Sequence, residues 1–160
     1  MSAALPHELT HVVLKERFAN TSMPLWADEG IAILADPSAK QARHRADLTS
    51  ALANGTTFPA RALLTLEEYP RPDQFGVFYA QSASLTEFLV RRKSPQQFID
   101  FIERATVEGY DTALRSCYDI AGIRKLDSEW RRDVIFSNVS YNRVVQNVSD
   151  FGGPLLRTSK

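Results

Sequence analysis

Two histidines four residues apart, His7 and His11, are the residues whose type and spacing most clearly could do chemistry in this sequence. On a helix, residues four apart lie one turn above each other, so both imidazoles can reach one metal ion. Glu8 follows the first histidine and can be directed at a water molecule on that ion. This spacing is typical of zinc sites in which the glutamate acts as a general base. The sequence therefore predicts a Zn2+ centre, with Glu8 as the base.

A zinc site with two histidines needs a third protein ligand, which leaves a fourth position for water. Glu29, in the next predicted helix, is the candidate for that ligand. A helix, a tight turn and a second, antiparallel helix would bring its carboxylate beside the histidines. Gly30 follows Glu29, and a glycine inside a helix costs about 1 kcal/mol relative to alanine. We therefore expect Gly30 to allow a close approach of these two helices at the metal.

The elements that must position these residues are helices. Apolar residues at helical spacing, prolines near helix starts and glycine or Asp-Pro stops define most of them. We predict helices over residues 2 or 6 to 18, 24–35, 38–53, 74–93, 95–109, 112–118 and 126–136. Residues 56–73 contain three prolines and are predicted to be mostly loop. The expected fold class is mainly α, although Val144, Val145 and Val148 leave room for one strand.

Length and composition fit one folded domain followed by a short tail. The chain has 160 residues, 19 basic and 19 acidic side chains, and one cysteine. A net charge of zero gives no electrostatic footprint for nucleic acid, and one cysteine excludes an internal disulfide framework. No apolar run approaches the roughly 18 residues that span a bilayer. We expect a domain over residues 1–136 and an irregular C-terminal tail over residues 137–160.

A family resemblance rests on two segments, HELTH at residues 7–11 and LWADEGIA at residues 25–32. Together they resemble the gluzincin metallopeptidases, in the peptidase MA-like branch that is related to the M1-type aminopeptidases. The resemblance implies that His7, His11 and Glu29 bind one Zn2+ per chain and that Glu8 is the general base. It also implies that residues 1–136 form the helical, C-terminal part of a zincin-like domain.

A third segment, FYAQSASLTEFL at residues 78–89, is similar to the part of M1-type enzymes that carries a transition-state tyrosine. Tyr79 matches that tyrosine, and its hydroxyl could donate a hydrogen bond to the oxyanion. An aromatic side chain on an apolar helix stripe is a core residue at least as often as a catalytic one. Both interpretations of Tyr79 stay open at this point.

Groups that would orient the histidines are harder to assign. Asp28 is next to Glu29 but points about 100° away on a helix, which makes it a weak candidate. Related enzymes often place an acidic residue one turn past the ligand glutamate, where this chain has Ile33. For the third histidine, His44, we expect a solvated helix face and not a metal ligand. Cys117 is expected to be a small core residue.

The resemblance implies hydrolysis of peptide bonds in a peptide or protein substrate. Peptidases of this kind carry a β-sheet lobe before the motif, and we expect that lobe to be missing from this chain. No signal peptide is recognisable at residues 1–9, and the location is unknown. Family members are often exported, which makes an extracytoplasmic location one alternative. Two alternatives remain: a zincin-derived metal-binding scaffold or interaction module without turnover, and a zinc hydrolase for a non-peptide substrate. The oligomeric state is unknown.

Overall fold

The structure, a computed structural model, describes residues 5–19 and 21–151, and their side chains as far as residue 137. Within these ranges all regular structure is helical, and the fold is mainly α as predicted. The elements are α1 (Leu5–Arg17), α2 (Leu25–Leu34), α3 (Ser38–Ala53), α4 (Ala60–Leu64), the 3-10 turn η1 (Pro72–Gln74), α5 (Phe75–Arg92), α6 (Pro95–Glu108), α7 (Tyr110–Tyr118) and α8 (Ile123–Phe151).

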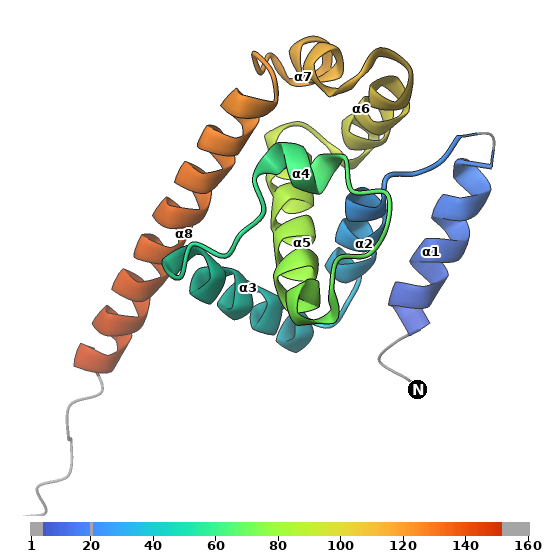
Figure 1. The fold of residues 1–160 in the computed structure, drawn as a ribbon. Helices are drawn as coiled ribbons and strands as arrows, with labels where there is room; N and C mark the ends of the chain where they lie inside the picture. Colours follow the sequence, from blue (N-terminus) through green and yellow to red (C-terminus); the bar gives the residue numbers. More distant parts are fainter. Residues whose placement is uncertain (1–4, 20, 152–160) are drawn as a thin grey trace, which may run out of the picture.

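Helix α5 lies in the middle of the fold and contacts α2, α3, α6 and α8 (Figure 1). It forms because apolar residues recur along it at helical spacing, and Phe78, Leu85 and Leu89 are almost fully buried. Helix α1 lies on the outside of the fold and packs mainly against α2, and the two helices run in opposite directions. The helix that carries both histidines is therefore held in place largely through α2.

Several helix boundaries confirm the sequence signals. Ser94 caps α6, its hydroxyl accepting a hydrogen bond from the backbone N–H of Gln97 at 3.1 Å, and Pro95 opens the helix. Helix α2 ends before Asp36 and Pro37, since the residue before a proline disfavours helical geometry. The predicted third helix has the same bounds as α3. Trp26 and Trp130 are fully buried, in agreement with the packing roles expected of them.

Residues 56–73 are mostly loop, as predicted, whereas most of the stretch from residue 137 that was expected to be irregular is helical. Residues 56–73 include α4 and the start of η1, which begin directly after Pro59 and at Pro72. The irregular tail predicted from residue 137 is wrong as far as Phe151, and so is the possible strand near Val144, because α8 runs through this stretch. The reason is that residues 137–151 contain no proline or glycine, and the helix-stopping residues come only at 152–154. Residues 152–160 lie outside the described part.

Gly30 lies where α2 packs closely against α5. A Cβ atom at this position would collide with Thr86 Oγ1 and would lie 2.8 Å from the carbonyl oxygen of Ser82. The expectation that Gly30 allows close packing is confirmed, but the partner helix is α5 and not α1. Close packing of α2 on α5 thus fixes the helix that carries Glu29.

Replacing Gly30 with alanine should therefore destabilise the fold. Overpacking a close helix contact costs about 1–3 kcal/mol, so Tm should fall by roughly 2–12 °C for a chain of this size. Gly76 is the matched control, because it lies in a helix and a Cβ there meets nothing within 4 Å. Gly76→Ala should leave Tm unchanged or slightly raised. Thermal unfolding of both variants checks this, and equal Tm values would contradict it.

In the part of the chain that the structure describes, no helix combines the length and the apolar character needed to cross a membrane.

Candidate metal centre

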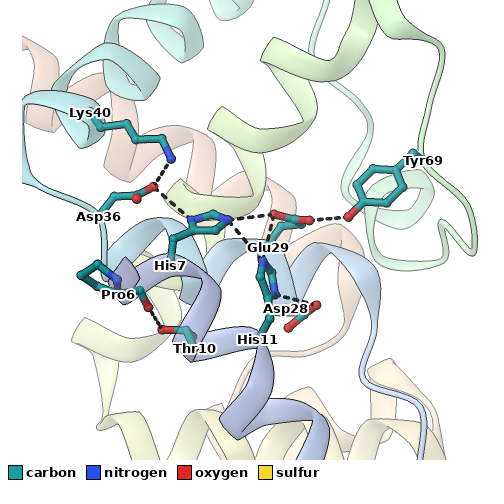
Figure 2. Close-up of polar contacts among 9 residues, drawn as sticks. All are labelled: Pro6, His7, Thr10, His11, Asp28, Glu29, Asp36, Lys40 and Tyr69. Carbon is teal, nitrogen blue, oxygen red and sulfur yellow. Dashed lines mark hydrogen bonds and ion pairs between the residues drawn. The ribbon is translucent and has the colours of Figure 1, made fainter. Parts of the chain in front are cut away.

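The predicted ligands come together between α1 and α2. His7 and His11 project from one face of α1, and Glu29 projects from α2 toward them (Figure 2). Their ligand atoms all lie within 4.8 Å of one another. Glu29 is only 5% exposed, whereas the histidines are partly open to solvent. The antiparallel pairing of the two helices expected from the sequence produces this convergence.

The distances between these atoms suit a zinc-sized ion. The two Nε2 atoms are 3.2 Å apart, and Glu29 Oε2 lies 3.8 Å from His7 Nε2 and 3.9 Å from His11 Nε2. A circle through three atoms at these separations has a radius of about 2.1 Å, close to the usual zinc–nitrogen and zinc–oxygen bond lengths. The three atoms could therefore ligate one ion with only small adjustments.

The hydrogen bonds of the two rings also favour a cation at this point. His7 Nδ1 lies 3.2 Å from Asp36 Oδ2, and His11 Nδ1 lies 3.0 Å from Asp28 Oδ2. An ionised carboxylate only accepts hydrogen bonds, so each Nδ1 donates to its carboxylate, and the tautomer that keeps such a ring neutral turns the lone pair of Nε2 toward the centre. Two nitrogen lone pairs and a carboxylate oxygen then face one another. Such an arrangement is stabilised by a positive charge among them, and imidazole with carboxylate is a donor set that suits zinc.

Asp36 is a residue of this candidate site that the sequence did not indicate. Its side chain is fully buried, and its Oδ2 accepts from Lys40 Nζ at 2.8 Å as well as contacting His7. Gln41 Nε2 donates to the backbone oxygen of Asp36 at 2.8 Å and so holds the turn after α2. Asp36 lies two helical turns beyond Glu29, whereas the position one turn beyond is occupied by Ile33. A search at seven-residue spacing would have found it.

Asp28 corrects a second expectation. The sequence made it a weak candidate because it points away from Glu29, yet it is the partner of His11 Nδ1. The reason is that the ring of His11 lies between the two neighbouring carboxylates, with Nε2 toward Glu29 and Nδ1 toward Asp28 (Figure 2). Each histidine therefore has a carboxylate at its Nδ1 atom. Such a carboxylate fixes the orientation of the ring and makes its Nε2 atom a more basic donor to a metal.

Tyr69 is, after Asp36, the second residue of this site that the sequence did not indicate. It lies between α4 and η1, and its hydroxyl donates a hydrogen bond to Glu29 Oε1 (Figure 2). Burial, together with the hydrogen bond to Glu29, raises the pKa of Tyr69 well above its usual value. The phenol therefore stays protonated and acts as the donor at neutral pH.

Tyr79, the predicted transition-state residue, lies on α5 at the edge of this cluster. Its ring centroid is 6.4 Å from that of Tyr69, and burial and the charge of Glu29 raise the pKa of its hydroxyl. Among the described residues its side chain makes ring contacts but no hydrogen bond or ion pair. Tyr79 is thus near Glu29, the candidate ligand, but the hydroxyl that contacts Glu29 belongs to Tyr69.

Glu8, the predicted general base, follows His7 on α1 and is exposed to solvent. Within the described part of the chain its carboxylate has no hydrogen-bond or ion-pair partner. It is therefore free of the contacts that hold Asp28, Glu29 and Asp36.

A groove begins at His11 and leads away from the centre. Its first part, about 530 Å³ in volume, lies between the C-terminal half of α1 and the α1–α2 turn. Its second part, about 890 Å³, continues from the same turn toward α4 and α6. Both parts share Thr21, Ser22, Met23 and Asp28. The groove offers an elongated ligand a path that ends at His11.

His44 lies outside the group formed by His7, His11 and Glu29, and the solvated helix face predicted for it is wrong. It is half-buried, its ring lies 6.5 Å from that of Tyr79, and burial lowers its pKa. Cys117 is likewise half-buried and free.

The fold and the site define a mainly helical domain with two histidines from one helix and a glutamate from the next directed at a common point. The chain belongs to the peptidase MA superfamily, whose family model matches residues 2–136. No curated protein and no solved structure matches the chain. Membership supports a metallopeptidase-like scaffold, and members of this superfamily usually bind a metal.

Proposed function

We propose that this chain is a zinc-dependent metallopeptidase of the gluzincin type, which hydrolyses peptide bonds with Glu8 as general base. The observation that carries the proposal is the convergence of His7 Nε2, His11 Nε2 and Glu29 Oε2 in a chain of the peptidase MA superfamily. These three residues would hold Zn2+. When bound, the ion supplies Lewis-acid chemistry, which makes water more acidic and polarises the substrate carbonyl.

The protein's own residues would transfer the proton, stabilise the oxyanion and orient the histidine rings. Glu8 takes the proton of the attacking water and passes it to the leaving amine, which needs a carboxylate free of other partners. The Tyr79 hydroxyl stays protonated, because burial raises its pKa, and can donate to the oxyanion of the tetrahedral intermediate. Asp36 and Asp28 keep the two histidine rings turned so that Nε2 faces the metal position.

The groove supports a peptide or protein as the substrate class. It is elongated, begins at His11, and is lined by both apolar and hydroxyl side chains from the α1–α2 turn, α4 and α6. An extended peptide presents alternating side chains and backbone polar groups, which such a lining can accommodate. The scissile bond would then lie at the end of the groove, beside His11.

The test is chelator-reversible hydrolysis of a mixture of unstructured peptides, followed by mass spectrometry. We expect cleavage by the zinc-loaded protein, loss of cleavage on treatment with a chelator, and recovery when stoichiometric zinc is returned. Cleavage that persists in the metal-free protein would contradict the mechanism. A protein that holds about one zinc per chain yet cleaves no peptide would favour the metal-binding scaffold without turnover.

A further inference from the structure

Tyr69 reaches Glu29 from a segment that is remote from both metal-binding helices. Its ring is held at the start of α5, where the centroids of Phe75, Phe78 and Tyr79 lie 6.1, 5.9 and 6.4 Å away. Pro70 follows it directly and restricts Tyr69 to an extended backbone. The ring is thus fixed by aromatic contacts and by the chain, and its hydroxyl is directed at the carboxylate.

The two oxygens of Glu29 have different partners. Oε1 accepts the hydrogen bond from Tyr69, whereas both histidine Nε2 atoms lie closest to Oε2 (Figure 2). A carboxylate can ligate an ion through one oxygen or through both. With Oε1 engaged by a charge-assisted hydrogen bond, rotation of Glu29 that would bring both oxygens to the ion is opposed.

We infer that Tyr69 is a positioning residue that makes Glu29 a ligand through one oxygen only. This inference rests on the proposed zinc site and goes beyond it. A glutamate that binds through both oxygens would occupy part of the position that a catalytic zinc site keeps open. By holding Oε1, Tyr69 leaves that position to water and substrate. The segment between α4 and η1 therefore belongs to the metal centre, although it contributes no ligand.

The experiment compares Tyr69→Phe with Tyr79→Phe. Each variant loses one hydroxyl and keeps its ring in the same aromatic cluster, but only Tyr69 touches Glu29. Zinc affinity is measured by competition with a chromophoric chelator, and coordination is followed by the visible absorption of the cobalt-substituted protein. Melting of the zinc-free proteins shows whether each variant is folded.

We expect Tyr69→Phe to bind zinc about 10-fold to 100-fold more weakly, the range found when a group supporting a ligand is removed. Its cobalt absorption should weaken, because cobalt absorbs less strongly as its coordination number rises and the freed Oε1 can now bind. Tyr79→Phe should retain the wild-type zinc affinity and cobalt spectrum, whatever it does to turnover.

Wild-type zinc affinity and an unchanged cobalt spectrum in Tyr69→Phe would overturn the inference and leave the proposed function standing. Equal losses in both variants would also overturn it, since the effect would then belong to the aromatic cluster and not to the hydrogen bond. A wild-type protein that binds no zinc would overturn the proposed function, and this inference with it.

Discussion

Replacing Glu8 with glutamine should lower kcat/KM for peptide hydrolysis by about 10²-fold to 10⁴-fold, the usual contribution of a general base. Glutamine has the same shape but cannot take a proton from the attacking water. The metal should stay in place, because none of the three converging ligand atoms belongs to Glu8. Folding should be unaffected, since the side chain is exposed and has no partner among the described residues. Peptide cleavage rates and zinc content per chain check both statements.

Glu16→Gln is the matched control for this experiment. Glu16 is also exposed and lies on α1, two turns beyond Glu8 and away from the ligand atoms. The substitution Glu16→Gln removes the same charge from the same helix as Glu8→Gln does. It therefore separates the loss of a general base from a change in the electrostatic field around the site. We expect wild-type cleavage from Glu16→Gln. Undiminished cleavage by Glu8→Gln at full zinc occupancy would show that another group accepts the proton.

The part of the site that was predictable from the sequence is the part that follows from helix periodicity. His7 and His11 are one turn apart, so their convergence depends only on α1 being a helix. The convergence of Glu29 with the histidines required one further condition, that α2 runs antiparallel to α1. The short turn between the two helices favours this arrangement. The mainly α fold was predictable for the same reason, because proline, glycine and Ser-Pro signals fix most helix ends locally.

The residues that hydrogen-bond to the candidate ligands were not predictable in this way. Their positions depend on how the helices cross, which no local sequence pattern encodes. Asp36 reaches His7 because the chain turns at Asp36-Pro37 and Lys40 neutralises the buried carboxylate. Asp28 reaches His11 because α1 crosses α2 with the ring between two neighbouring carboxylates. Tyr69 comes from a proline-containing stretch that was predicted as mostly loop. Its role depends on the aromatic cluster at the start of α5, which forms only when distant segments pack together.

Replacing Glu29 with glutamine should remove the response of the protein to zinc while preserving its fold. In the wild type, free zinc at 100 times Kd should stabilise the folded chain by about 2.7 kcal/mol. For a chain of this size that corresponds to a rise in Tm of roughly 5–10 °C. The variant should show little or no rise and should retain little zinc after gel filtration, because a neutral amide oxygen replaces the only anionic ligand atom of the three.

The zinc-free state separates loss of a ligand from loss of structure. Glutamine has the shape of Glu29, and its amide oxygen can still accept the hydrogen bond from Tyr69. In the zinc-free wild type a carboxylate that is only 5% exposed faces two histidine nitrogens, an arrangement that is costly without a cation. The zinc-free variant should therefore melt at the same temperature as the zinc-free wild type or above it. A variant that melts normally and still gains the full zinc-induced rise would show that Glu29 is not a ligand, and that the ion is held by the two histidines with a different third group.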